Sequence, residues 1–311
     1  MRWIHTRSRG AALLLLMFVL SIMLSLALIG VYARPRNLAQ QAEITTQSLA
    51  QAKLSLIAWS LSQKATSYNR SRPGEFPCPD LHAPGEEYEG WPGTASDDSC
   101  NTNARRIGRL PWNTLGLPKL VDGSGETLWY MVVSPFHDSN TAALNSNTAQ
   151  PYNLHAFANG GSTAYPGAIA ILFAPGSLLA GQVRNNASQQ ITPANYLEHY
   201  GSYNNASTSP TITRLNGPLT NATGTLLVND QLVVITAADI LPKVLQRAVA
   251  EYPVALKKKY PLPPYPPAQE GGCIGTPPSV EMYGIDSDWL NRNAWETLLR
   301  YDCSTMAIQK K

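Results

Sequence analysis

The chain has few charged residues and no recognisable catalytic motif. Asp, Glu, Lys and Arg make up only 14% of its 311 residues. The sequence contains no Gly-x-Ser-x-Gly elbow, no His-Glu-x-x-His pair, no phosphate loop and no dinucleotide-binding glycine fingerprint. Its five histidines are scattered, so they indicate no acid–base or metal-binding set. These absences favour a protein that is not an enzyme and holds no cofactor.

Acidic residues are missing from the first 36 positions, which hold five arginines. The whole chain has a net charge of +3, but 19 basic and 21 acidic residues remain beyond position 36. The positive charge therefore belongs to the N-terminal segment, and it predicts no binding to nucleic acid.

That N-terminal segment has three parts in sequence order. Arg2, Arg7 and Arg9 come first, Gly10 follows, and then Ala11–Tyr32 carries no charge. As a helix, this apolar run would extend about 33 Å, enough to cross the hydrocarbon core of a bilayer. We therefore predict a transmembrane helix at 11–32, with the N-terminus in the cytoplasm.

The helical pattern continues past Pro35. Apolar residues recur there at steps of three and four, which gives one stripe on a helix, with glutamines and lysines between them. We therefore predict an amphipathic continuation at 33–68 that packs one face on a globular domain. The stripe consists of Ala50, Leu54, Ile57, Leu61, Ala65 and Tyr68.

A short basic leader ending in glycine, an apolar helix and an amphipathic continuation resemble the type IV pilin and type II secretion pseudopilin superfamily. The resemblance implies that a prepilin peptidase cuts after Gly10, leaving Ala11 as the mature N-terminus. It also implies that the freed helix packs with those of other subunits. Most members have glutamate at the fifth mature position, which is Leu15 here. The resemblance is therefore closest to the minor, tip-type members that lack this acid.

Three runs further along the chain are also similar to runs in pilin-like exported proteins of Gram-negative bacteria: Pro77-Cys-Pro-Asp80, Arg109-Leu-Pro-Trp112 and Asp122-Gly-Ser-Gly-Glu126. These runs imply no activity.

Two other interpretations of the N-terminus stay open. Val31-Tyr32-Ala33 fits a signal-peptidase site that would release the chain from Arg34, and the apolar run could also be an uncleaved anchor. The alternative function is an anchored or secreted extracytoplasmic enzyme or carbohydrate-binding domain.

All four cysteines lie beyond the apolar run, at Cys78, Cys100, Cys273 and Cys303. An even number in an exported domain predicts two disulfides. Of the three connectivities we favour Cys78–Cys100 and Cys273–Cys303, because each closes a local loop, worth about 3 kcal/mol. Zinc is disfavoured because no cysteine pair has ligand spacing.

An acidic loop could offer oxygen ligands for calcium. Its spacing matches no EF-hand, so a solvated loop is the favoured interpretation. The acids of this loop are Asp80, Glu86, Glu87, Glu89, Asp97 and Asp98.

We expect an α+β fold in which a long N-terminal α-helix, with a membrane-spanning half and an amphipathic half, packs on a loop-rich, disulfide-stapled mixed α/β domain. The expected parts are a leader at 1–10, the helix segments at 11–32 and 33–68, a globular domain at 69–260, and a Pro-rich strap with a C-terminal helical segment at 261–311. Within them we expect strands at 127–133 and 168–173, a hairpin at 225–235, and helices at 237–256 and 288–301.

The expected function is that of a minor pilin or pseudopilin subunit in a type II secretion or type IV pilus system. Its expected partners are other such subunits, a prepilin peptidase and inner-membrane lipid. The expected location is the bacterial inner membrane, crossed once, with the bulk of the chain in the periplasm.

Overall fold

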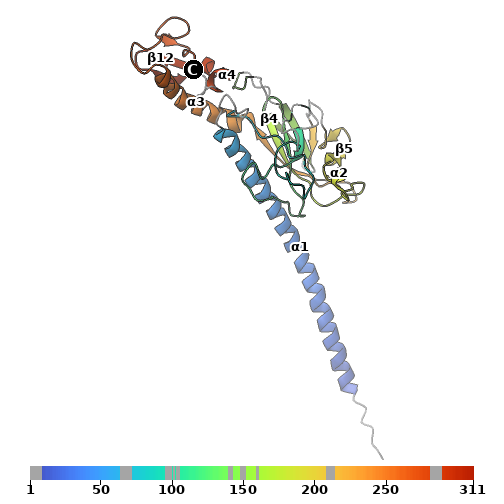
Figure 1. The fold of residues 1–311 in the computed structure, drawn as a ribbon. Helices are drawn as coiled ribbons and strands as arrows, with labels where there is room; N and C mark the ends of the chain where they lie inside the picture. The colour runs from blue at the N-terminus through green and yellow to red at the C-terminus, as the bar shows by residue number, and fades with distance from the viewer. Residues whose placement is uncertain are drawn as a thin grey trace, which may run out of the picture.

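A computed structural model describes residues 9–63, 72–94, 100, 102, 106–138, 143–147, 152–158, 161–207, 214–280 and 289–311. One helix, α1, dominates the outline of the molecule (Figure 1). The β-sheet lies beside the C-terminal half of this helix. The C-terminal part of the described chain, coloured orange to red, lies at the end of the molecule farthest from the start of α1 (Figure 1).

Helix α1 runs from Arg9 to Ser62 over 54 residues. The placement of its side chains is described for residues 14–25 and 37–62. From Thr45 onward it packs into the hydrophobic core, where it contacts strands β4 and β10 and helix α3. Its buried side chains recur at steps of three and four: Thr45, Leu49, Ala52, Leu56, Ile57 and Ser60.

This buried face is rotated from the predicted one. Leu54 is 67% exposed and Ala50 is also exposed, whereas Ile57 is buried as predicted and Leu61 is half-buried. Ala65 and Tyr68 lie outside the described residues. The observed face uses small residues such as Ala52 and Ser60, which allow close approach of the domain. A search for apolar residues alone could not find it.

The described part of the chain contains no helix long and apolar enough to span a membrane. This finding contradicts three predictions. They are the transmembrane helix at 11–32, the membrane-spanning half of the predicted fold class, and the single-pass location in the inner membrane.

The main sheet has six strands: five follow the order β1-β2-β4-β3-β7, and the sixth, β10, also pairs with β4. All pairs are antiparallel except β3 with β7. The strands are β1 (Ile107–Arg109), β2 (Trp129–Val132), β3 (Tyr152–Ala158), β4 (Gly161–Ala174), β7 (Arg214–Asn216) and β10 (Gln231–Thr236).

Both faces of the central strands are buried, which explains why their sequences read as continuous apolar runs. Tyr130, Val132 and Leu172 face the core shared with α1 and α3. Trp129 and Phe173 face a second core, which is covered by Tyr196 and Leu197 of a long segment between β4 and β7. The segment from 177 to 205 that provides this cover is called the covering segment below.

The covering segment contains α2 (Ala187–Gln190), the 3-10 helix η2 (Pro193–Asn195), β5 (His199–Tyr200) and β6 (Tyr203–Asn204). Strands β8 (Leu219–Thr220) and β9 (Leu226–Val228) then form a separate small ladder. The predicted hairpin at 225–235 is therefore wrong, because β9 pairs with β8 and β10 pairs with β4. The turn at Asn229–Asp230 sends the chain from one sheet to another.

Helix α3 (Ala237–Lys259) begins with a capping box formed by Thr236 and Asp239. It continues to Lys259, three residues beyond the predicted end at 256. Beyond it lie β11 (Ile274–Gly275), α4 (Trp289–Arg292), η3 (Trp295–Leu298), β12 (Leu299–Asp302) and β13 (Ala307–Lys310), the three strands forming one sheet. The helix predicted at 288–301 thus gives way to strand β12 at Leu299.

Candidate functional site

The first described turns of α1 form an exposed apolar surface. The large apolar side chains of residues 14–25 have exposed fractions between 43% and 70%. Figure 1 shows this part of the helix well away from the sheet. Leu15, the residue at the position of the missing acid, is 68% exposed. Gly10 and Ala11 lie within the bounds of α1, but their side chains are outside the described set.

The polar side chains of this stretch are already bonded within the helix. The Ser21 hydroxyl donates to the Phe18 carbonyl oxygen at 2.8 Å, and the Ser25 hydroxyl donates to the Ser21 carbonyl oxygen at 2.8 Å. Hydroxyl groups that bond back to the helix need no outside partner. The surface formed by residues 14–25, here called the apolar stem, therefore suits an apolar neighbour on all sides.

A turn at Asp122–Glu126 holds α1 where the helix reaches the domain. The Gly123 N–H donates to the Thr45 hydroxyl at 2.9 Å, and the Ser48 hydroxyl donates to the Val121 carbonyl oxygen at 2.6 Å. A Cβ atom on Gly123 would lie 2.1 Å from the Gln41 carbonyl oxygen. Glycine at 123 is therefore what allows backbone-to-backbone contact between turn and helix.

The Asp122 carboxylate organises this turn. One oxygen, Oδ1, accepts from the N–H groups of Ser124 and Glu126 at 2.8 and 3.0 Å, while Oδ2 accepts from the Gly176 N–H at 2.7 Å. The turn is thereby tied to the end of strand β4 as well as to α1. The Asp122-Gly-Ser-Gly-Glu126 run, found from sequence as a turn, works here as a helix clamp.

The other two runs meet each other. Asp80 and Arg109 exchange two backbone hydrogen bonds of 2.9 Å, and the Arg109 Nε atom lies 3.7 Å from the Asp80 carboxylate. The same carboxylate bonds the His82 ring at 2.9 Å and accepts from the Gly90 N–H at 2.9 Å. Burial raises the pKa of Asp80, against the pull of the Arg109 guanidinium. These contacts fix a buried junction of loops and do not leave an open cleft.

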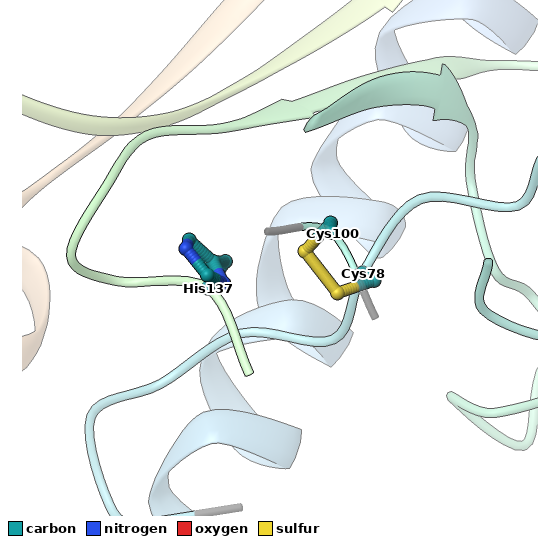
Figure 2. A group of neighbouring side chains, drawn as sticks. All are labelled: Cys78, Cys100 and His137. Carbon is teal, nitrogen blue, oxygen red and sulfur yellow. A yellow bond between two sulfur atoms is a disulfide. The ribbon is translucent and has the colours of Figure 1, made fainter. Parts of the chain in front are cut away.

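Both predicted disulfides are confirmed. Cys78 bonds Cys100, and Cys273 bonds Cys303. Figure 2 shows His137 beside the Cys78–Cys100 bridge. The sulfur and ring nitrogen atoms of these three residues lie within 4.8 Å of one another. Each sulfur is bonded to the other, so neither is a thiolate that could ligate a metal. Sequence spacing gave no sign of His137 at this position.

The acids weighed for calcium do not converge where they are described. Asp80 is held by His82 and Arg109, Glu86 accepts from the Ala83 N–H, and Glu89 pairs with Lys119. Asp97 and Asp98 lie outside the described residues. In the part of the chain that the structure describes, the cysteine–histidine group is the one set of three metal-ligating residues.

One buried acidic pair was missed by sequence reasoning. Glu198 belongs to no motif that the sequence showed, and it lies against Asp230 of the turn before β10. Residues 198 and 230 are far apart in sequence, and no motif links them.

Comparisons with family models, with characterised proteins and with solved structures found no match for this chain.

Proposed function

We propose that this chain is a structural subunit of a pilin-like or pseudopilin-like assembly. It joins other subunits through the apolar stem of α1 and presents the sheet and the C-terminal segment away from that contact. The observation that carries the proposal is the stem itself, twelve residues whose apolar side chains have no partner within the described chain. Exposed apolar surface of this extent is typical of an interaction site.

The chemistry of the stem favours a helix as its partner. It has no charged residue, and its two serine hydroxyls are bonded to its own carbonyl groups. Burying such a surface against another apolar helix costs no unsatisfied polar group. Each fully buried leucine or phenylalanine side chain would contribute about 1.5–3 kcal/mol.

The clamp supports the same function from the other end of the helix. Because Gly123, Thr45 and Ser48 fix α1 to the domain, the position of the stem in an assembly also fixes the position of the domain. A subunit with a freely hinged helix would present its domain in no defined place. A continuous clamped helix suits a part that is built into a filament.

The leader completes the proposal. Cleavage after Gly10 by a prepilin peptidase would leave Ala11 at the N-terminus, four residues before Leu15. A subunit with leucine at that place lacks the acid that pairs with a neighbour's N-terminal amine. Such a subunit suits the tip of a pilus or secretion pseudopilus, where no further subunit lies above it.

The test is the mature N-terminus of the full chain, measured by intact mass after co-expression with a prepilin peptidase. The proposal predicts loss of residues 1–10 in the wild type and an uncut chain for Gly10→Val. The matched control is Gly30→Val, a change to the same residue within the apolar run, which should leave cleavage unaltered. A chain beginning at Arg34, or an intact Met1 with active peptidase present, would overturn the processing route.

A further inference from the structure

Two buried carboxyl groups meet where the covering segment crosses the turn before β10. Glu198 is 7% exposed and Asp230 is fully buried. Their contact is reciprocal. The Glu198 N–H donates to Asp230 Oδ2 at 2.9 Å, and the Asp230 N–H donates to Glu198 Oε2 at 3.1 Å. The two groups therefore hold each other's backbone as well as facing one another.

The other hydrogen-bond partners of the pair, within the described residues, are neutral amides. The Asn205 side chain donates to Asp230 Oδ2 at 2.7 Å, the Gln182 side chain donates to Glu198 Oε1 at 2.6 Å, and the Asn229 N–H donates to Glu198 Oε2 at 3.0 Å. No cation forms an ion pair with either carboxyl group within the described residues. Amide donors can stabilise one negative charge here, but they cannot neutralise two.

The charged groups on the surrounding elements are committed elsewhere or point to solvent. Arg184 donates to Gln182 Oε1 and to the Asn195 carbonyl oxygen, and it pairs with Glu126 at 2.6 Å. His199 on β5 is exposed. Arg214 belongs to β7, and its side chain is outside the described set. Among the described side chains, none of these charged groups is therefore a counter-ion for Glu198 or Asp230.

One oxygen of the pair is left for a proton. Asp230 Oδ1 is buried and accepts no hydrogen bond from the N–H and O–H donors of the described chain. A proton held by the pair would remove one of two like charges in this buried site. Burial raises the pKa of both groups, and the Glu198 charge raises that of Asp230 further.

The pair lies where the covering segment packs on the sheet, beside a pocket. The covering segment packs on the sheet mainly through Tyr196, whose ring is 5.0 Å from that of Trp129, and through Leu197. A pocket of about 470 Å³ beside Glu198 brings solvent close to the pair; Leu179, Ala194, Asn204 and Leu227 are among its other lining residues.

We propose that Glu198 and Asp230 form a proton-dependent latch. With one shared proton, the latch holds the covering segment over the second core; when the proton passes to a base in solvent, two adjacent buried carboxylates repel and the segment loosens. Opening releases one proton. The equilibrium constant for opening should therefore rise by at most about tenfold per pH unit above the raised pKa of the pair. This inference does not depend on the proposed assembly role.

The test is hydrogen exchange of the full-length chain, followed by mass spectrometry of peptides from 193–206 between about pH 5 and 9. Rates are corrected for the intrinsic pH dependence of exchange. Wild-type protection of these peptides should fall as pH rises, while peptides from α3 keep theirs. Asp230→Asn is the matched variant, because its amide can donate to Glu198 without a titrating proton. Its protection should stay constant over the range.

Two results would overturn the latch: wild-type protection that does not vary with pH, or the same variation in Asp230→Asn. Asp302→Asn, at a half-buried acid on β12 that is distant in sequence from the covering segment, controls for loss of a carboxylate and should behave as wild type in the 193–206 peptides. If Asp230→Asn does not fold, carboxyl-carbon NMR of the wild type decides the matter. A latch requires a carboxyl resonance that titrates above the ordinary range, and ordinary midpoints for both groups would exclude it.

Discussion

The backbone of Gly123 lies against the backbone of Gln41, so closely that a Cβ atom on Gly123 would meet the Gln41 carbonyl oxygen at 2.1 Å and its Cα at 2.6 Å. Neither neighbour is the flexible end of a side chain, so neither can move without shifting the helix or the turn. This contact, together with Thr45 and Ser48, is where α1 changes from a free helix into part of the core.

The first prediction concerns this contact. Gly123→Ala should lower the free energy of unfolding by about 1–3 kcal/mol, because the added methyl group forces turn and helix apart. Urea denaturation measures the change. Gly272→Ala is the control, since a Cβ there would meet only the Ile274 carbonyl oxygen at 3.8 Å and the residue is not left-handed. Equal stability of the two variants would contradict the role given to Gly123.

The second prediction separates assembly from folding. Leu20→Lys in the apolar stem should prevent incorporation into filaments while leaving thermal stability unchanged, because Leu20 is 58% exposed and packs on nothing in the described chain. Leu54→Lys is the matched control, at a leucine 67% exposed on the clamped half of the same helix. Incorporation is measured by immunoblot of sheared filaments. Equal incorporation of both variants would count against the stem as the contact surface.

The missing acid gives a third prediction. Under the proposed function, Leu15→Glu introduces the acid that most pilins and pseudopilins carry at the fifth mature position, and a subunit adapted to a tip should then lose or change its incorporation. The same filament assay measures this. Unchanged incorporation and filament output would show that Leu15 does not define the subunit's position.

A fourth prediction follows from the capping box of α3. Burial alone would raise the pKa of Asp239, but the Thr236 N–H and the Lys53 ammonium group outweigh it and hold the pKa below its ordinary value. A depressed pKa in the folded chain means a stabilising contribution that is present above the unfolded pKa. It is lost as the pH falls through the folded pKa.

Stability should therefore drop in this acidic range, and Asp239→Asn should make the drop smaller. Asparagine keeps an oxygen for the Thr236 N–H but has no charge for Lys53. Chemical denaturation at a series of acidic pH values measures the effect. An unchanged acid profile in the variant would mean that other carboxyl groups account for the loss.

The fifth prediction concerns the bridge next to His137. Replacing both Cys78 and Cys100 by serine should cost about 3 kcal/mol in the free energy of unfolding by the loop-entropy account. Both residues are almost fully buried, so the hydroxyl groups would add to the cost. Urea denaturation of the double variant and of the oxidised wild type gives the difference in the free energy of unfolding. A difference near zero would mean that the loop is held by its other contacts alone.

Local patterns predicted the local features of this fold. The apolar runs at 127–133 and 168–173 form β2 and part of β4, and the helix predicted from 237 begins there, capped by Thr236 and Asp239. Short-range cysteine pairing was also correct. Each of these depends on residues close in sequence, so the physical cause is visible in the sequence itself.

The failures all depended on distant partners. The buried face of α1, which includes the small residues Ala52 and Ser60, packs against strands and a helix that are distant in sequence. Strand β10 pairs with β4 over six residues instead of with β9. The meeting of Glu198 with Asp230, and of His137 with the Cys78–Cys100 bridge, required the folded topology. No spacing rule within one segment could have shown them.

The most direct measurement is photo-crosslinking from the apolar stem in cells that make the full assembly. A photoreactive amino acid replaces Leu20 in one variant and Leu54 in the other, and adducts are identified by mass spectrometry. The account predicts that Leu20 crosslinks to another copy or to a different subunit with an apolar N-terminal helix, while Leu54 does not. A chain that is present at normal levels but forms no such adduct at Leu20 would contradict assembly through the stem.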